Sequence, residues 1–247
     1  MINSLVTRVS PAPGPRIIWL DLARTAAIVA MVVFHFCFDL AMFGLIPWEA
    51  VQTGFLRMLA VCTAASFLFL AGVGLVVAHG RGIRWPSVWR RFAILAGAAA
   101  VITLATYVTQ PQAFIFFGIL HSIAVASILG LAFLRLPVLA VLAASGFVVW
   151  LHFNVAWPAF DHPALIWLGL GTYIPRTLDF EPVFPWFGAA LAGIAFGQIA
   201  SRLGWFTAGP VTGAVKWLCW PGQQSLKIYL IHQPVLVSLV WLWVTLT

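Results

Sequence analysis

The chain has 247 residues, of which 63% are hydrophobic and only 8% are charged, and its mean hydropathy is +1.04. A soluble domain of this length could not cover its core with so few charges, so we expect an all-α integral membrane protein that contacts the lipid bilayer along most of its length. The net charge of +7 raises the question of nucleic-acid binding. Basic loops at a membrane surface explain this charge better, and we expect no nucleic-acid partner.

Hydropathy predicts about seven transmembrane helices in a single domain over residues 1–247, after a short N-terminal segment, 1–16. The predicted spans are 17–43, 55–78, 91–109, 113–134, 137–153, 183–200 and 225–246. The apolar stretch 164–174 is too short to cross and is expected to be re-entrant or interfacial. No short apolar segment with a cleavage site precedes the first span, so we expect that span to be retained as a signal anchor.

The basic residues predict the orientation of these spans. If the N-terminus is cytoplasmic, most basic side chains between and before the spans lie inside, and only Arg176 lies in an outer loop. The inner set is Arg8, Arg16, Arg81, Arg84, Arg90, Arg91, Arg135, Arg202 and Lys216. By the positive-inside rule we expect a cytoplasmic N-terminus, an outer C-terminus and a multi-pass protein of the inner, cytoplasmic membrane.

The first span carries four ionisable side chains inside an otherwise apolar run: Asp21, Arg24, His35 and Asp39. At about 100° per residue they fall within an arc of about 60°, so they form one polar stripe. Ionisable groups within a membrane cost several kcal/mol unless they pair or face a polar cavity. The stripe is therefore the first candidate for a functional site.

Two local pairs can form within the stripe. An imidazole such as that of His35 suits a general base, and Asp39 lies one turn further along, where it could orient the ring. The alternative is that His35 and Asp39 only neutralise each other inside the bundle. Asp21 can pair with Arg24 in the same way, and Arg24 can also extend to the inner headgroups.

Arg24 and His35 enclose ten residues, an arrangement that resembles the first-span signature of membrane-bound acyltransferases. Longer stretches are similar to the short bacterial members of the heparan-alpha-glucosaminide N-acetyltransferase catalytic-domain family. They are RIIWLDLARTAAIVAMVVFHFCFDLAMFG, SFLFLAGVGL, FFGILHSIAVASIL, PVFPWFGAALAGIAFG and SLKIYLIHQPVL. The resemblance covers about residues 16–236. It implies transfer of an acetyl group from cytoplasmic acetyl-CoA to an amino sugar or glycan hydroxyl on the outer side; the lysosomal glycosaminoglycan substrate is not carried over.

Roles for the other histidines follow from the resemblance together with depth along the spans. His121 (FFGILHSIA) should lie near mid-membrane, at a depth comparable to His35, and His232 (LKIYLIHQP) closer to the depth of Arg24. We expect His35, Asp39 and His121 to be catalytic and Arg24 and His232 to contact acetyl-CoA. A lone buried histidine is also a common packing residue, and that alternative stays open for His121 and His232. No metal is expected, because His35, Asp39 and His121 lack metal-ligand spacing.

The predicted inner loop HGRGIRWPSVWRR contains Arg81, Arg84, Arg90 and Arg91. These arginines could hold the phosphates of CoA. The alternative is ordinary positive-inside topology with an interfacial aromatic belt.

The longest outer stretch, 154–182, carries Asp161, His162, Asp179 and Glu181. Long outer loops often shape the mouth of a binding site, whereas a solvated acidic loop is the simpler interpretation.

A different class of function uses the same polar stripe. A transporter or proton-coupled permease could conduct ions along it, but such proteins are typically built from inverted repeats, and no such symmetry is evident in the sequence. A catalytically inactive membrane protein is a third alternative, and a homodimer is compatible with the sequence.

Overall fold

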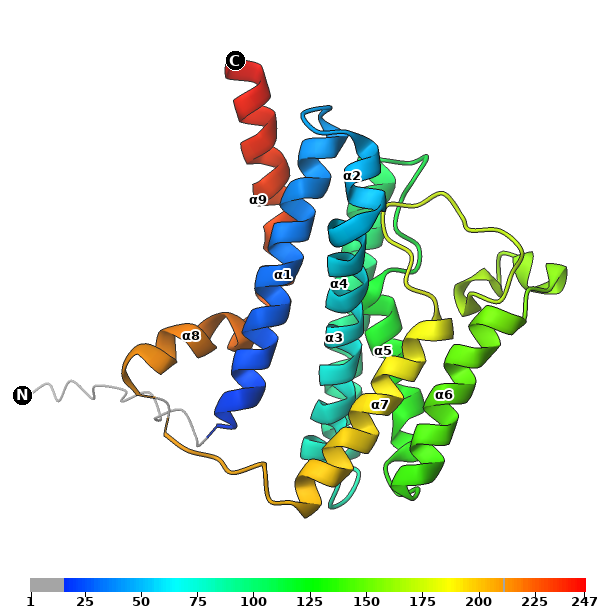
Figure 1. Cartoon of the computed structure of the whole chain (residues 1–247), viewed down its shortest axis with the longest axis vertical. Coiled ribbons are helices and arrows are strands. Elements are labelled where there is room, and N and C mark those ends of the chain that lie inside the picture. The colour runs from blue at the N-terminus through cyan, green and yellow to red at the C-terminus, as the bar shows by residue number, and fades with distance from the viewer. Residues whose placement is uncertain (1–15, 211) are drawn as a thin grey trace, which may run out of the picture.

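The computed structural model describes residues 16–210 and 212–247, and this part of the chain is a helical bundle without strands (Figure 1). Five of its helices are long and apolar enough to cross a membrane. They are α1 (Ile18–Met42), α3 (Gly54–His79), α4 (Trp85–Thr109), α7 (Val183–Arg202) and α9 (Ser225–Leu246). The expectation of a multi-pass helical membrane protein is thereby confirmed.

Two further apolar helices are shorter, and they match the fourth and fifth predicted spans. They are α5 (Ile119–Leu129), which continues as a 3-10 turn over Gly130–Phe133, and α6 (Val138–Asn154). The remaining elements are α2 (Trp48–Gln52), α8 (Gly213–Gln223) and the 3-10 turns Pro158–Asp161 and Ile166–Leu168. The count of seven crossings and the orientation of the termini stay predictions.

Two predicted boundaries are wrong. Helix α4 begins at Trp85 and not at 91, because Pro86 suits the first helical turn, so Arg90 and Arg91 lie on a helix and not in a loop. Helix α5 begins six residues later than the predicted 113. The chain before it is extended and hydrogen-bonds to the segment that precedes α7: the amide of Leu178 donates to the carbonyl of Ala113 at 2.9 Å.

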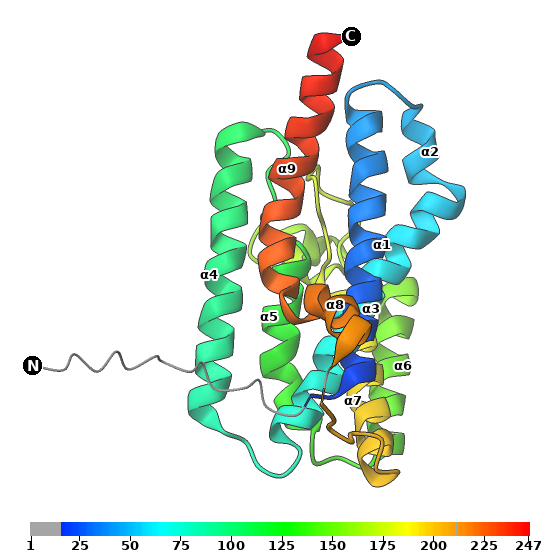
Figure 2. The same ribbon diagram turned by 90° about the vertical axis from the view of Figure 1, so that its left-hand side faces the viewer.

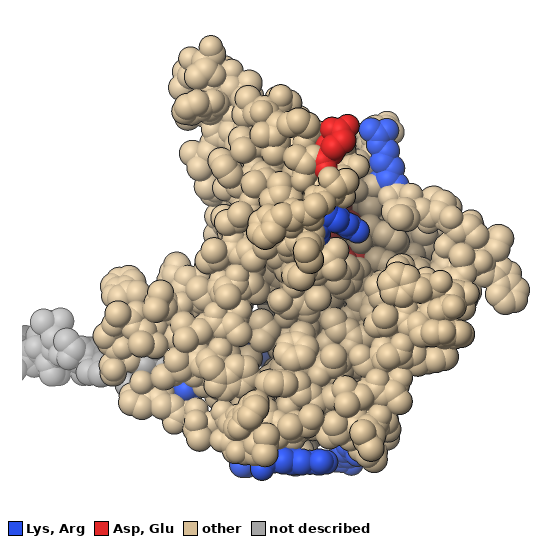
Figure 3. All heavy atoms as spheres, in the orientation of Figure 1, with Lys and Arg blue, Asp and Glu red and all other residues tan. Residues whose placement is uncertain are grey.

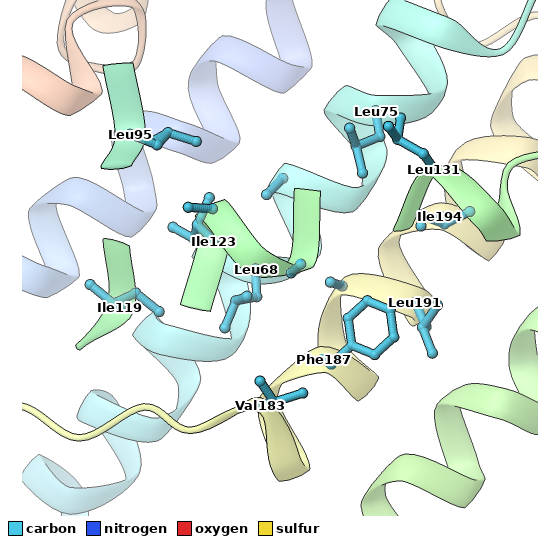
Figure 4. Close-up of a cluster of buried hydrophobic side chains, with 14 of the residues drawn as sticks. Leu68, Leu75, Leu95, Ile119, Ile123, Leu131, Val183, Phe187, Leu191 and Ile194 are labelled. Carbon is cyan, nitrogen blue, oxygen red and sulfur yellow. The ribbon is translucent and has the colours of Figure 1, made fainter. Parts of the chain in front are cut away.

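Helix α3 is central, and its contact with α7 is the closest in the bundle. A Cβ atom on Gly72 would collide with the backbone of Ala190, and one on Gly193 would collide with the backbone of Phe69. Small residues of this kind let two helix backbones approach within a membrane. Around this contact the apolar side chains form one core, whose labelled members include Leu68, Leu191 and Ile194 (Figure 4).

On the other side of α1 lie α8 and α9. Helix α8 runs across the N-terminal half of α1, where the hydroxyl of Thr25 donates to the carbonyl of Leu218 at 2.8 Å and the amide of Gly222 donates to that hydroxyl at 2.9 Å. Helix α9 then follows α1 and diverges toward the C-terminus (Figure 1). This arrangement places the start of α9 well inside the length of α1.

On the face shown in Figure 3 charged side chains are sparse, and basic ones gather at the end of the bundle where α3 and α7 finish. Arg81 and Arg84 lie in the connection from α3 to α4, and Arg202 is the last residue of α7. At the opposite end, Arg57 lies in the first turn of α3. The clustering at one end is what the positive-inside rule requires of a cytoplasmic face.

Candidate active site

The polar stripe of α1 faces the neighbouring helices α8 and α9, which lie beside it in Figure 2. Each of three stripe residues meets a polar side chain from these helices. The pairs are Asp21 with Gln223, His35 with His232, and Asp39 with Gln233. The stripe is therefore paired mainly across helices rather than along α1.

His35 and His232 form the central pair. Their ring centroids lie 4.8 Å apart with the planes at 81°. Nδ1 of His35 lies 2.9 Å from the carbonyl of Met31, and Nδ1 of His232 lies 2.7 Å from the carbonyl of Tyr229. Because a carbonyl only accepts, both Nδ1 atoms carry the hydrogen and both Nε2 atoms keep a free lone pair. Nε2 of His232 is buried and has no hydrogen-bond partner among the described residues.

Asp39 does not orient the His35 imidazole as expected. Its side chain is fully buried, and its Oδ1 accepts a hydrogen bond of 2.6 Å from Nε2 of Gln233. The Met31 carbonyl, one turn before His35, orients that ring instead. Asp39 and Gln233 thus form a second polar contact between α1 and α9, one turn beyond the histidine pair.

The predicted depth of His232, closer to Arg24, is also wrong. Gln223, at the end of α8, donates to Asp21 at 3.2 Å, so α9 begins beside the lower part of α1 rather than at the end of the bundle. The contact between the two rings places His232 at the level of His35. The amphipathic crossing of α8, which hydropathy does not reveal, causes the displacement.

His121 lies in a different environment, at the start of α5. Its Nδ1 accepts a hydrogen bond of 3.2 Å from the amide of Gly118, so its hydrogen resides on Nε2. That nitrogen lies 3.3 Å from Oγ1 of Thr103, whose hydroxyl donates to the carbonyl of Ile115 at 2.7 Å. Both ring nitrogens of His121 are therefore used within the fold.

His121, His35 and Asp39 do not form a group that could hold a metal ion. Within residues 16–210 and 212–247, no group of three or more histidine, cysteine, aspartate or glutamate side chains could hold a metal ion.

The segment before α7 brings two carboxylates against the bundle. Oδ2 of Asp179 accepts a hydrogen bond of 3.0 Å from the amide of Ile119, at the N-terminus of α5. The amide of Glu181 donates to the carbonyl of Phe117 at 3.1 Å, and Oε2 of Glu181 is buried without a partner among the described residues. The simple interpretation of a solvated acidic loop does not apply to these two residues.

Burial changes the acidity of both carboxylates. It raises the pKa of Asp179 to about 6, although the Ile119 amide partly opposes the effect. Burial and the nearby charge of Asp179 raise the pKa of Glu181 well above its ordinary value, partly offset by Arg57. Tyr229 of α9 lies within electrostatic range of both carboxylates, and its ring centroid is 5.5 Å from that of His232.

Asp161, in the same outer stretch, is bound differently. The backbone amide of Thr172 donates to its Oδ1 at 2.6 Å, and the Thr172 hydroxyl donates to Oδ2. These hydrogen bonds lower the pKa of Asp161. Near it, Nδ1 of His162 accepts from the amide of Ala164 at 3.2 Å. Asp161 and His162 therefore stabilise the local turn.

Toward the end of the bundle where the basic side chains gather, Arg24 and Arg91 converge on α3. A Cβ atom at Gly74 would lie 3.7 Å from Nη2 of Arg24 and 3.6 Å from Nη1 of Arg91. Nη1 of Arg24 pairs with Asp21 at 3.2 Å, and the same carboxylate lies 3.6 Å from Arg16. No carboxylate of the described residues forms an ion pair with Arg91. Asp21 is thus shared by Arg24 and Arg16, and Arg91 beside them adds positive charge that an anion would stabilise.

The other predicted arginines lie elsewhere. Nη2 of Arg84 donates to the carbonyl of Ala78 at 3.2 Å, near the end of α3. Arg81 and Arg90 are exposed to the surroundings. Of the four arginines around the α3–α4 connection, the structure brings Arg91 alone next to Arg24.

Sequence reasoning missed three residues that complete this arrangement: Gln223, Tyr229 and Gln233. Tyr229 and Gln233 belong to the apolar last span and flank His232, and polar side chains within a span seldom lack a partner. That signal could have identified Gln233 as a neighbour of the first-span stripe.

Comparison with known proteins adds one match. The family described as heparan-alpha-glucosaminide N-acetyltransferase, catalytic, matches residues 16–234. No curated protein and no solved structure matches the chain. The matched range includes both histidines of the central pair, both carboxylates before α7 and the two converging arginines. The chain therefore belongs to the heparan-alpha-glucosaminide N-acetyltransferase catalytic-domain family, a family of transferases.

Proposed function

We propose that this protein transfers an acetyl group from cytoplasmic acetyl-CoA to an amino sugar or glycan hydroxyl on the outer side of the inner membrane. Family membership supports acetyl transfer as the class of reaction. The observation that carries the assignment of the site is the His35–His232 pair, two imidazoles inside the bundle with free Nε2 lone pairs. A general base or an acyl carrier needs such a lone pair.

Two chemical routes use the same nitrogen of His35. In the first, Nε2 attacks the thioester carbonyl, the carbon–sulfur bond breaks, and the CoA thiolate leaves; the acceptor then attacks the acyl-imidazole and loses its proton to His232. In the second, Nε2 of His35 takes the proton of the acceptor while the acceptor attacks the thioester carbonyl directly, the carbon–sulfur bond breaks, and the CoA thiolate leaves. In both routes the second imidazole accepts or relays a proton, which is why two adjacent neutral histidines are useful.

The acceptor is assigned to the side of Asp179 and Glu181. Both carboxylates lie within electrostatic range of Tyr229, whose ring centroid is 5.5 Å from that of His232, so a group bound beside them would lie on the side of the histidine pair. A carboxylate can bind the ammonium of an amino sugar and then take its proton, and a raised pKa favours that exchange near neutral pH. Asp39 and Gln233 act as positioning residues that hold α9 in register with α1.

The phosphates of acetyl-CoA are assigned to Arg24 and Arg91 beside Gly74. Guanidinium groups bind phosphate through charge-assisted hydrogen bonds, and of these two only Arg24 pairs with a carboxylate of the described residues, that of Asp21. Arg81, Arg84 and Arg90, around the same α3–α4 connection, would add long-range attraction for the cofactor. This assignment requires that end of the bundle to face the cytoplasm.

The orientation is tested by cysteine labelling after the three native thiols have been removed. With Arg84→Cys inside and Asp161→Cys outside, an impermeant reagent added to intact cells should label only the cysteine at position 161. Labelling at position 84 alone would reverse the topology and with it the direction of transfer.

The reaction itself is tested with purified protein in lipid nanodiscs. Acetyl-CoA and glucosamine are supplied, free thiol is measured over time, and the acetylated sugar is identified by mass spectrometry. We expect thiol release with the wild type and none above background with His35→Ala. A transporter that uses the same stripe would release no thiol from acetyl-CoA, and equal rates for both proteins would end the assignment of His35.

A further inference from the structure

A cavity of about 530 Å³ lies between α4 and α5 and does not include the histidine pair. Ala96, Ala99 and Ala100 of α4 line it, and such small side chains leave space between two helices. Its lining extends along α4 from Phe92 to Tyr107, which is about 22 Å at 1.5 Å per residue. The volume falls in the range of about 300–1,000 Å³ that is typical of small-molecule sites.

The two ends of this cavity differ in polarity. Toward the start of α4 the lining is apolar, whereas Thr103, Tyr107 and His121 line the other end. Phe117 also lines that end, and its carbonyl accepts the hydrogen bond from the amide of Glu181. The wall at the polar end of the cavity is therefore bonded to the segment that we assign to the acceptor.

The side of the cavity opens on a lipid-facing surface. Its rim residue Leu104 is 65% exposed, and the neighbouring Val101 and Val108 of α4 are 62% and 73% exposed. In a spanning helix such an apolar surface contacts hydrocarbon and not water. One leaflet contributes about 15 Å of a hydrocarbon core of about 30 Å, so the cavity is long enough to hold an extended chain through one leaflet.

We propose that this cavity binds the hydrocarbon chain of a lipid-linked acceptor. The chain would lie in the apolar part beside Ala96 and Ala100, and its sugar would emerge at the polar end, beside Glu181. The inference rests on the proposed acetyltransferase function and specifies its substrate: a sugar anchored in the membrane by one alkyl or polyisoprenyl chain. An anchored acceptor reaches the site by lateral diffusion in the bilayer, through the open side between α4 and α5.

Binding is tested independently of turnover with a dodecyl glucosaminide that carries a diazirine near the end of its chain. The probe is photolysed with the protein in nanodiscs, and the labelled residues are mapped by mass spectrometry. We expect labelling concentrated on the cavity residues of α4 and α5. Ala100→Trp, which fills the cavity, should abolish that labelling, whereas Ala105→Trp, on an exposed part of α4 outside the lining, should preserve it.

A turnover measurement complements the labelling. The dodecyl glucosaminide should show a lower KM than free glucosamine, and Ala100→Trp should raise the KM for the chain-bearing acceptor more than for the free sugar. Ala105→Trp should leave both values unchanged. If Ala100→Trp does not fold, as judged by size-exclusion chromatography, Ala96→Leu fills less of the same space and replaces it.

The outcomes separate this inference from the proposed function. Even labelling of α4 and α9, unaffected by Ala100→Trp, overturns the lipid-chain site whatever the enzyme does. Acetylation of both acceptors with equal KM also overturns it and leaves the acetyltransferase intact. Specific labelling of the cavity without any acetyl transfer supports the site as a lipid-binding cavity and overturns the proposed function.

Discussion

The bundle holds two kinds of histidine site, and they differ in how the ring nitrogens are used. In the His35–His232 pair each Nδ1 is held by a carbonyl of its own helix, and each Nε2 is left free. In His121 the hydrogen is on the other nitrogen, and both nitrogens have partners. All three are histidines in apolar, family-like sequence contexts, so burial and motif do not separate them. The hydrogen bonds do, because a base needs a lone pair that the fold has not used.

The neighbouring elements explain the difference. The ring of His121 reaches the amide of Gly118 before α5 and the hydroxyl of Thr103 on α4, so it connects two elements of the α4–α5 side. His35 and His232 instead face each other across two helices that meet through side chains. The first arrangement stabilises a helix start, and the second leaves reactive groups at a helix interface.

The largest expected effect tests directly whether the free Nε2 atom distinguishes His35 from His121. His35→Ala should lower the rate of acetyl transfer by about 10²–10⁴-fold if His35 is a general base, and by more if it carries the acyl group. His121→Ala should lower the melting temperature, since loss of a helix cap costs about 0.5–2 kcal/mol, while the folded fraction remains active. Rates of thiol release and melting temperatures are measured for both variants in nanodiscs.

His232→Ala tests the other member of the histidine pair. We expect a loss of rate that approaches that of His35→Ala, because the two imidazoles share one proton path. If His121→Ala folds normally and is as inactive as His35→Ala, the distinction drawn from the hydrogen bonds is wrong and His121 returns to the catalytic set.

The same contrast between paired and unpaired groups applies to the arginines and gives the second prediction. Arg24→Gln and Arg91→Gln should each weaken acetyl-CoA binding by about 10–150-fold, since a hydrogen bond to a charged group contributes about 1.5–3 kcal/mol. Asp21 keeps Arg16 as a partner in Arg24→Gln, so the fold should tolerate the change. Binding is measured by isothermal titration calorimetry.

Arg202→Gln, at the same end of the bundle, serves as the charge-matched control and should change binding by less than about threefold, as expected of a screened surface charge. Equal effects of Arg91→Gln and Arg202→Gln would mean that the arginines act only through the general field of that surface.

The first helix was the most predictable part of the molecule. Four ionisable residues on one face of an apolar run can only be accommodated by partners, and the structure provides them for Asp21, His35 and Asp39. The identity of the partners could not be derived, because it depends on where α9 begins along α1. That register is determined by the contact of α8 with Thr25, a tertiary contact with no periodic signal in the sequence.

The outer stretch before α7 was the least predictable. Asp179, Glu181 and Asp161 look alike in sequence, as acidic residues of one long loop. Only the pairing of 178–181 with 113–117 brings two of them into the bundle, and pairing between segments more than sixty residues apart leaves no local pattern. Hydropathy predicts that 113–117 belongs to a span. The early predicted start of α5 and the prediction of a solvated loop at Asp179 and Glu181 therefore have one cause, the unrecognised pairing of these two segments.

A third prediction tests the second polar contact between α1 and α9. Asp39→Asn keeps an oxygen that can accept from Gln233 but removes the charge, so we expect partial activity, reduced by about tenfold or less in kcat/KM. Asp39→Leu removes the acceptor and leaves a buried amide unpaired, and it should lower both activity and melting temperature. Activity of Asp39→Asn as low as that of His35→Ala would show that the carboxylate takes part in the chemistry.

The smallest expected effect concerns two carboxylates of the outer stretch, Asp179 and Asp161, whose pKa values are shifted in opposite directions. The pKa of Asp179, about 6 in the folded protein, lies above its unfolded value of about 3.9. Between these values the folded state holds a proton that the unfolded state lacks. The stabilisation is therefore complete below about pH 4 and is lost as the pH rises through about 6.

At pH values above 6, Asp179→Asn should consequently increase the free energy of unfolding, by on the order of 3 kcal/mol or less, and so raise the melting temperature. It should also flatten the pH dependence of the melting temperature. Asn can still accept the hydrogen bond from the Ile119 amide, so the start of α5 should persist.

Asp161→Asn is the control of opposite sign: hydrogen bonds from Thr172 lower the pKa of Asp161, so its stabilisation is present above the unfolded pKa and is lost as the pH falls. Melting curves from pH 4.5 to 8 compare the two variants, with Glu181 and Arg57 unchanged in both. A lower melting temperature for Asp179→Asn at pH 7.5 would show that the ionised form of Asp179 is the stabilising one, and the acceptor side would then carry a fixed negative charge rather than a group ready to exchange a proton.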